Sequence, residues 1–176
     1  IGGTDIRNMS LEDYNRYIAY VSQDNFLFDD TIMENIRMGR EGASDEEVID
    51  AAKRCGCHDF IMGLENGYDT ILLNDATNIN SDVKYVLAII RVFLKKTKIM
   101  LFDEVFDYLS KDISTNILDF LKNLKNENTI IVITKNKNIL KDEVVNQEIL
   151  LDNNKVVGIG LYDDLKDDNK KIFNNM

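Results

Sequence analysis

The sequence contains no proline and no tryptophan, and it has no long hydrophobic run. Its longest nearly apolar stretch, residues 86–94, is interrupted by Arg91. That stretch is too short for a transmembrane helix, which needs about 20 apolar residues. Positive charge is also scarce, because 21 Lys and Arg residues stand against 31 Asp and Glu residues. The net charge of −10 disfavours nucleic acid or an anionic membrane surface as the main partner, since both require a basic face.

Cysteine is nearly absent as well. Cys55 and Cys57 are the only two, and they lie too close together for an ordinary long-loop disulfide, which favours a reducing compartment. With His58 they form a tight group of potential metal ligands. A closed metal site usually needs four ligands, and no second pair accompanies this group. A structural role is therefore favoured over a metal site.

Short apolar segments alternate with helical patterns along the 176 residues. Strands are predicted at 17–22, 98–102 and 129–134, and the β-branched third segment is expected to be fully buried. Residues 148–152 and 155–159 flank Asn153-Asn154, a sequence typical of a two-residue hairpin turn. Strands alternating with helices indicate a parallel sheet covered by helices.

Three helices carry clear signals. Ser44 and Glu47 form a capping box at the start of the first. Residues 82–95 are apolar on nearly every side, so this helix is expected to be deeply buried. The third follows an apolar stripe from Ile113 to Leu124, and a mostly helical block at 31–95 interrupts the α/β pattern. The aromatic residues near the N-terminus are expected to pack in the core and the helical block: Tyr14, Tyr17, Tyr20, Phe26 and Phe28.

Two adjacent carboxylates, Asp103 and Glu104, follow the predicted strand 98–102. The carboxyl end of a buried strand is where open α/β sheets bind ligands. Neighbouring strand residues face opposite ways, so one acid can hold Mg²⁺ through its water shell while the next orients an attacking water. The alternative is that the pair merely ends a strand and caps a turn.

Several motifs in a fixed order resemble the nucleotide-binding domain of an ATP-binding cassette (ABC) transporter, nearest the exporter type, over residues 1–166. They are GTDIR at 3–7, YVSQD at 20–24, Phe28, TIMENI at 31–36, GYDT at 67–70, Leu87-Ala88-Ile89 with Arg91, the Asp103-Glu104 strand, and GLYDDL at 160–165. The resemblance implies an α/β fold, a P-loop NTPase-like (RecA-like) parallel-sheet core with an inserted helical subdomain and a C-terminal β-hairpin, lacking the phosphate-loop strand. The helical subdomain would span about 31–95, the core 1–30 and 96–166, and an acidic, polar tail 167–176.

The resemblance also implies site residues. Gln23 matches the Q-loop glutamine, which senses Mg²⁺ through water, and Asp103 matches the magnesium-side acid of the Walker B strand. Glu104 matches the catalytic carboxylate. The implied cofactors are ATP and Mg²⁺. The implied partners are a transmembrane domain and a second nucleotide-binding domain, identical or not, with no nucleic acid, at the cytoplasmic face of the plasma membrane.

The sequence departs from the family at the phosphate loop. No Gly-x-x-x-x-Gly-Lys-Ser/Thr motif is present, and in the family this loop lies upstream of the point where the chain starts. The chain is therefore expected to be a piece cut after its phosphate loop. Such a piece is not expected to bind ATP tightly by itself.

Two further departures lie within the matched region. The signature Leu-Ser-Gly-Gly-Gln falls on Ile79, Asn80, Ser81, Asp82 and Val83. Both glycines are missing, and Asp82 would set a negative charge near a phosphate, whereas the same residues are good N-caps for the following helix. The switch histidine falls on Lys135, which can reach a phosphate but cannot accept a hydrogen bond.

The sequence is compatible with two functions. The first is a degenerate ATP-binding subunit that couples ATP binding and hydrolysis to export. The second is a catalytically inactive pseudo-ATPase with an assembly or regulatory role, so whether the chain is an enzyme stays undecided. The intact Asp103 and Glu104 favour the first, whereas Asp82 and Lys135 favour the second. A DNA-repair relative is a weaker third, which the acidic charge disfavours.

Overall fold

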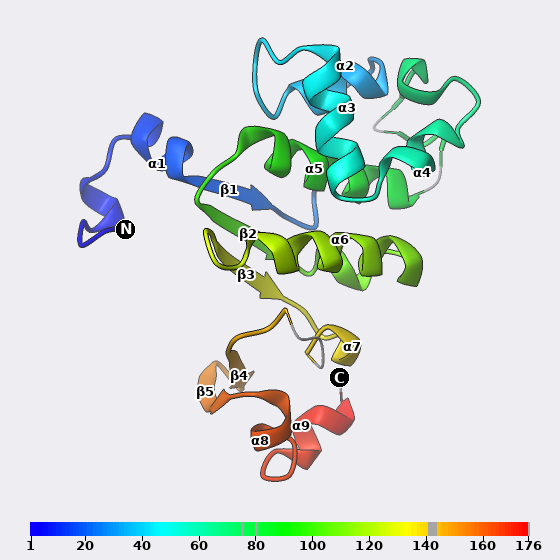
Figure 1. Ribbon diagram of the computed structural model, residues 1–176. Helices are drawn as coiled ribbons and strands as arrows, with labels where there is room; N and C mark the ends of the chain where they lie inside the picture. The colour runs from blue at the N-terminus through cyan, green and yellow to red at the C-terminus, as the bar shows by residue number, and fades with distance from the viewer. Residues whose placement is uncertain (75, 80, 141–143, 176) are drawn as a thin grey trace. The chain divides into compact units, whose positions relative to one another are not determined.

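The computed structural model describes residues 1–74, 76–79, 81–140 and 144–175 (Figure 1). The chain divides into two compact units, Ile1–Ile133 and Thr134–Met176, and each is described by itself. No helix within the described ranges has the length and apolar character needed to cross a membrane.

Three parallel strands form the sheet of the first unit. They are β1 (Ile18–Val21), β2 (Ile99–Asp103) and β3 (Thr129–Ile133), in the order β1-β2-β3. The register places Val21 beside Phe102, and Phe102 beside Val132. The predicted parallel sheet is therefore confirmed, with strand ends within one residue of those predicted.

The first unit begins with η1 (Ile6–Asn8) and α1 (Leu11–Tyr17). The helices between β1 and β2 are α2 (Ile32–Arg37), α3 (Asp45–Arg54), α4 (His58–Met62), η2 (Gly67–Asp69) and α5 (Ser81–Lys95). The capping box predicted before α3 is confirmed, because Ser44 accepts from the Glu47 backbone while the Glu47 side chain accepts from the Ser44 backbone.

Two long helices, α5 and α6 (Lys111–Leu124), lie against the sheet (Figure 1). Alternate residues of β2, Met100 and Phe102, point to these helices and are buried. Phe93 of α5 packs against Phe102 and meets Phe120 of α6 edge-on, with ring centroids 6.3 and 4.7 Å apart. The predicted deep burial of α5 is confirmed, since most of its apolar residues are less than 7% exposed.

The opposite face of the sheet is partly exposed among the described residues of the first unit. Tyr20 of β1 is 55% exposed, and Ile131 and Ile133 of β3 are 47% and 53% exposed. The expectation that 129–134 is a fully buried strand is therefore wrong. β3 pairs with β2 along one side, and its β-branched residues that face away from α5 and α6 have little packed over them in the described residues.

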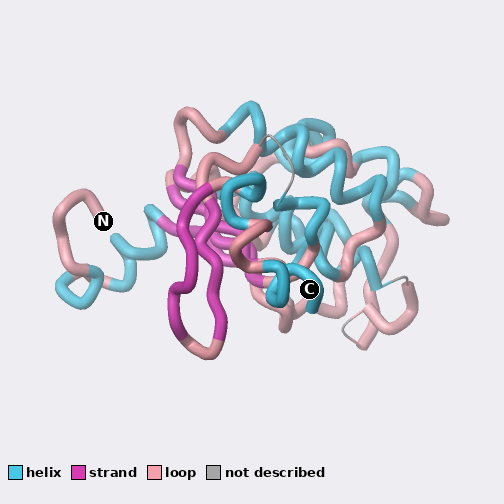
Figure 2. The backbone as a smooth tube through the Cα atoms, turned by 90° about the horizontal axis from the view of Figure 1, so that it is seen from below, coloured by secondary structure: helices cyan, strands magenta, loops and turns pink. Residues whose placement is uncertain are grey.

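The second unit contains α7 (Lys137–Leu140), β4 (Glu148–Asp152), β5 (Lys155–Gly160), α8 (Tyr162–Leu165) and α9 (Lys170–Asn175). Figure 2 shows β4 and β5 as a two-stranded antiparallel ribbon. The predicted hairpin is confirmed: Asn153 and Asn154 have φ angles of 46° and 60°, the left-handed conformation that a type I′ turn requires.

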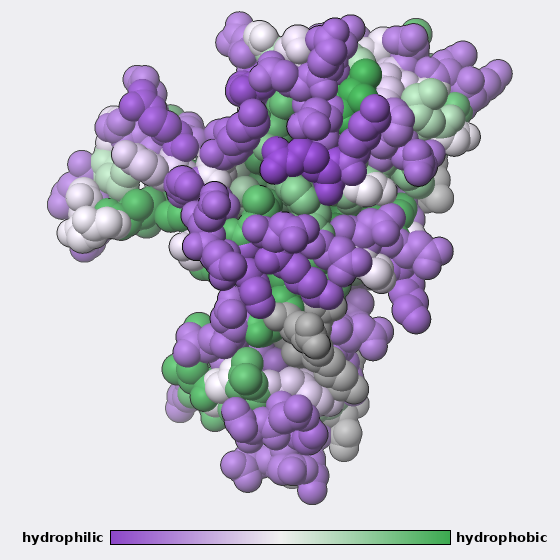
Figure 3. All heavy atoms as spheres, viewed as in Figure 1, coloured by the Kyte–Doolittle hydropathy of each residue, from purple (hydrophilic) through white to green (hydrophobic). Residues whose placement is uncertain are grey.

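A small core holds the second unit together. Leu150, Leu165 and Phe173 form a buried cluster, so residues 167–176, expected to be an acidic and polar tail, include a helix with a buried aromatic side chain. The other face of the hairpin carries exposed apolar side chains, seen as green spheres over β4 and β5 in Figure 3.

Candidate functional site

The two acids end β2 at the carboxyl edge of the sheet. Asp103 is the last residue of the strand, and Glu104 turns the chain into η3 (Val105–Asp107) with a left-handed φ of 55°. The Glu104 backbone N–H donates to the carbonyl of Ile133 in β3 at 2.8 Å. The neighbouring strand thus fixes the backbone from which both carboxylates project.

Residues of β1 and its extension reach both acids. The amide of Gln23, two residues after β1, donates a short hydrogen bond to Oε2 of Glu104. The Tyr20 hydroxyl donates to Oδ2 of Asp103 at 2.8 Å. This hydrogen bond to the Asp103 carboxylate, with smaller contributions from burial and the Asp103 charge, raises the pKa of the Tyr20 phenol. The structure therefore joins Gln23 to Glu104 and Tyr20 to Asp103 at the carboxyl edge of the sheet.

Tyr20 is a member of this site that the sequence analysis missed. The N-terminal aromatic residues were expected to pack in the core and the helical block, and this is wrong for the four that are 43% to 61% exposed: Tyr17, Tyr20, Phe26 and Phe28. Tyr20 occupies the alternate position of β1 that faces the open side of the sheet. Its partner could have been found from the strand register, because Tyr20 and Asp103 share that face.

The residues at this edge suit a hard cation better than they suit phosphate. Carboxylate and amide oxygens, as in Asp103, Glu104 and Gln23, are the ligand types that Mg²⁺ prefers, directly or through water. The 176 residues contain no glycine-rich loop with a lysine, which would supply backbone N–H donors for a nucleotide's phosphates. The arrangement offers oxygen ligands of the kind that Mg²⁺ and an ordered water require, and these residues include no phosphate cradle.

The residues at the altered signature positions lie just before and within the first turn of α5. Ile79 lies in the preceding loop, Asn80 lies outside the described residues, and Ser81 is the first residue of the helix. Asp82 is in the first helical turn, where a negative charge stabilises the helix dipole. Val83 is fully buried, so its side chain packs in the core. Lys135 is an exposed residue of the second unit, between β3 and α7.

A half-buried arginine fixes the loop that follows Gln23. Arg91 of α5 donates to the carbonyls of Asn35 and Phe26 at 2.6 and 2.8 Å and to the Asn35 amide oxygen at 2.9 Å. The Asn35 side chain also exchanges hydrogen bonds with both the N–H and the carbonyl of Phe28. Burial lowers the pKa of Arg91. One guanidinium thus connects α5, α2 and the loop at residues 23–28.

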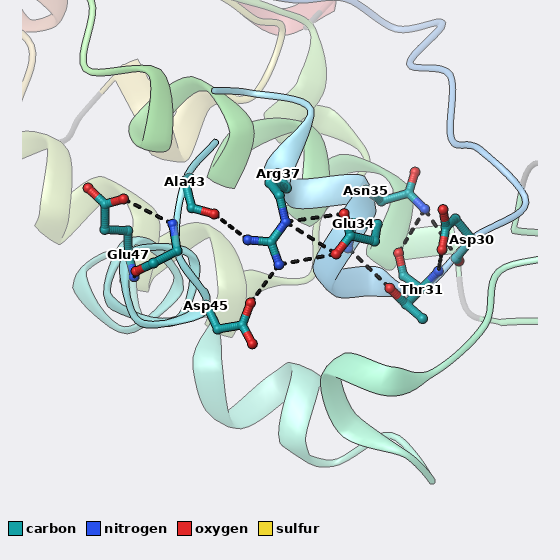
Figure 4. A network of polar contacts seen from close by, with 9 residues as sticks. Asp30, Thr31, Glu34, Asn35, Arg37, Ala43, Asp45 and Glu47 are labelled. Atoms are coloured by element: carbon teal, nitrogen blue, oxygen red, sulfur yellow. Dashed lines mark hydrogen bonds and ion pairs between the residues drawn. The ribbon is translucent and has the colours of Figure 1, made fainter. Parts of the chain in front are cut away.

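A second polar network joins α2 to α3 (Figure 4). Arg37 forms ion pairs with Glu34 at 3.1 Å and Asp45 at 2.6 Å, and it donates to the carbonyl of Ala43. These contacts raise the pKa of Arg37, first through the hydrogen bond to Glu34 and then through that to Asp45. They hold the short loop before the capped N-terminus of α3.

Cys55, Cys57 and His58 lie where α3 ends and α4 begins. Both thiols are buried, and neither forms a disulfide. A hydrogen bond with Cys57, together with burial, raises the pKa of the Cys55 thiol. The His58 ring nitrogen Nδ1 lies 3.0 Å from the Tyr68 hydroxyl. Across the part of the chain that the structure describes, no group of three His, Cys, Asp or Glu residues is arranged to hold a metal ion.

Known proteins are similar to this chain in sequence and in fold. An uncharacterized ABC transporter ATP-binding protein of Sinorhizobium fredii is 38% identical over 133 residues, covering 76% of the chain and 23% of that protein. The uncharacterized ABC transporter ATP-binding protein YfiC of Bacillus subtilis is 34% identical over 165 residues, 94% of the chain and 27% of the relative. The chain belongs to the ABC transporter ATP-binding family. No family model matches the chain.

The fold of this ABC homologue agrees with that of a solved exporter. The structure of a bacterial Atm1-family ABC exporter with ATP bound superimposes with a TM-score of 0.90 and 30% identity, covering 99% of the chain and 31% of the exporter chain. The predicted α/β class, with its parallel sheet and exporter-type relatives, is thereby confirmed. The chain spans about a quarter of the length of the curated relatives described above.

Proposed function

We propose that the chain is the ATP-hydrolysing part of an ABC exporter. In this proposal Asp103 and Gln23 hold Mg²⁺ through water, and Glu104 accepts the proton of the water that attacks the γ-phosphate. Bound Mg²⁺ would neutralise charge developing on the phosphates. The single observation that carries the proposal is the convergence of Gln23, Asp103 and Glu104 at the carboxyl edge of β1 and β2.

Hydrogen bonding supports the division of roles between the two acids. The Gln23 amide holds Glu104, and the Tyr20 hydroxyl holds Asp103, so each carboxylate has its own donor. A carboxylate fixed in this way can accept a water proton without reorganising. Because these 176 residues lack a phosphate loop, the proposal requires that the loop is supplied from outside them.

The proposed partners follow the family. A transmembrane domain would meet the helical subdomain, about 31–95, at the cytoplasmic face of the plasma membrane. A second nucleotide-binding domain would face the start of α5 and supply an intact signature. This chain would offer a weak one in return, because Val83 is buried and Asp82 places a negative charge in the first helical turn.

The test is ATP hydrolysis by the full-length native protein with Glu104→Gln. Loss of a general base lowers the rate by about 10²–10⁴-fold. Glu127→Gln, which alters an exposed acid after α6, serves as the matched control and should keep the wild-type rate. Equal hydrolysis by the wild type and Glu104→Gln would contradict the proposal.

A pseudo-ATPase with an assembly role is the second candidate, favoured by the signature positions at the start of α5. It predicts no hydrolysis in the native protein even when a nucleotide-binding domain with an intact signature is present. It also predicts that export by the assembled transporter is the same with Glu104 and with Gln at that position. A loss of export with Glu104→Gln would exclude it.

A further inference from the structure

The Tyr20 hydroxyl is built into the site by the register of the sheet. Tyr20 lies opposite Leu101 in the β1–β2 ladder, so Asp103 is its diagonal neighbour on the same face. Neighbouring strands lie about 4.8 Å apart and two residues rise about 6.6 Å along a parallel strand, so the two Cα atoms are about 8 Å apart, a distance that a tyrosine side chain spans. The result is the 2.8 Å hydrogen bond from the phenol to Oδ2 of Asp103.

The hydrogen bond between Tyr20 and Asp103 joins two regular strands that pair with each other. Both residues belong to parallel strands whose pairing is continuous from Ile18 to Val21 on β1. The Tyr20 side chain is 55% exposed, so it contributes little to the core and its hydroxyl is the part with a defined partner. Gln23, three positions later, serves Glu104 in the same way. Side-chain donors at residues 20 and 23 thus orient the two acids, to which the proposed function gives different roles.

We propose that Tyr20 is a positioning residue for the metal-side carboxylate, holding Asp103 in the orientation in which it serves Mg²⁺. The inference rests on the proposed function, in which Asp103 is the magnesium-side acid. Hydrogen-bond partners behind a metal ligand fix its orientation, and losing one costs about 10–100-fold in metal affinity. Tyr20 touches Asp103 and acts through it.

The experiment measures Mn²⁺ binding to the nucleotide-free, full-length native protein by electron paramagnetic resonance, with Tyr20→Phe as the main variant. Phenylalanine keeps the ring and removes only the hydroxyl. The expected result is a dissociation constant for Mn²⁺ raised about tenfold, at the lower end of that range because the site is partly exposed. The Mg²⁺ concentration for half-maximal ATP hydrolysis should rise by a similar factor, and the rate should recover as Mg²⁺ is raised.

Two further variants separate the hydroxyl from other causes. Tyr17→Phe alters an exposed tyrosine at the end of α1 and should leave Mn²⁺ affinity at the wild-type value. Tyr20→Leu removes the hydroxyl and the ring, and it should weaken Mn²⁺ binding no more than Tyr20→Phe does. If only the leucine variant loses affinity, the ring and not the hydroxyl matters, and the inference is overturned.

The outcomes also separate the inference from the proposed function. If Asp103→Asn abolishes Mn²⁺ binding while Tyr20→Phe binds as the wild type does, Tyr20 has no positioning role and the proposed function stands. If Asp103→Asn leaves Mn²⁺ binding unchanged, Asp103 is not the metal-side acid, and both are overturned together.

Discussion

Replacing Arg91 with alanine is expected to lower the free energy of unfolding of the first unit by about 2–4 kcal/mol. The guanidinium serves three acceptors, the Asn35 carbonyl, the Asn35 amide oxygen and the Phe26 carbonyl. An unsatisfied buried acceptor costs about 1–3 kcal/mol. Asn35 is 0% exposed, so the full cost applies to its backbone carbonyl. The Phe26 carbonyl lies in an exposed segment and can accept a hydrogen bond from water instead. The half-buried arginine side chain also makes packing contacts that alanine would lose.

Urea unfolding followed by circular dichroism measures this loss. Arg16→Ala is the matched control, because Arg16 pairs with Glu12 at 3.3 Å on the surface and such pairs contribute less than about 1 kcal/mol. Arg91→Lys keeps the charge but cannot reach all three oxygens, so it should fall between the wild type and Arg91→Ala. If Arg91→Ala costs no more than Arg16→Ala, Arg91 does not organise the Gln23–Phe28 loop.

Three other changes test separate parts of the account. Gly39→Ala should destabilise the first unit by at least about 1–3 kcal/mol in urea unfolding, because a Cβ there would lie 2.5 Å from the Arg91 carbonyl of α5; a neutral effect would refute this tight packing. Glu148→Gln should raise the thermal midpoint of the second unit at pH 7 and leave it unchanged near pH 4. Burial raises the pKa of Glu148, so its contribution is favourable at low pH and is lost as pH rises through the folded-state pKa; a midpoint that changes equally at both pH values would contradict this. Asn154→Gly should stabilise the hairpin by a few tenths to about 1 kcal/mol, since residue 154 has a φ of 60°, and a loss of stability would argue against the type I′ turn.

Much of the fold followed from local signals in the sequence. The Ser44 capping box, the Asn153-Asn154 turn and the apolar surface of α5 each specify their structure through nearby residues, and all three are confirmed. The burial of β3 did not follow, because an apolar β-branched strand has the same sequence whether one or both of its faces are covered. Coverage depends on which elements pack over the sheet, and that is tertiary information.

In the candidate site too, some residues could be assigned from the sequence and others required the tertiary structure. Asp103 and Glu104 could be placed from the strand that precedes them, and their proximity to Gln23 followed from the resemblance to the family. Tyr20 could not be assigned to the site without knowing that β1 lies beside β2 and in which register. The Arg91 network was also beyond the sequence, because it joins residues 56 and 65 positions apart through backbone carbonyls, which carry no sequence signal.

A single-turnover measurement shows directly whether Glu104 takes part in ATP hydrolysis. The full-length native protein is mixed with Mg²⁺ and radiolabelled ATP below the protein concentration, and the bound nucleotide is identified over time. We expect the wild type to convert bound ATP to ADP and phosphate, Glu104→Gln to retain ATP, and Tyr20→Phe to hydrolyse ATP normally once Mg²⁺ is raised. Conversion at the wild-type rate by Glu104→Gln would contradict the assignment of Glu104 at the carboxyl edge of the sheet.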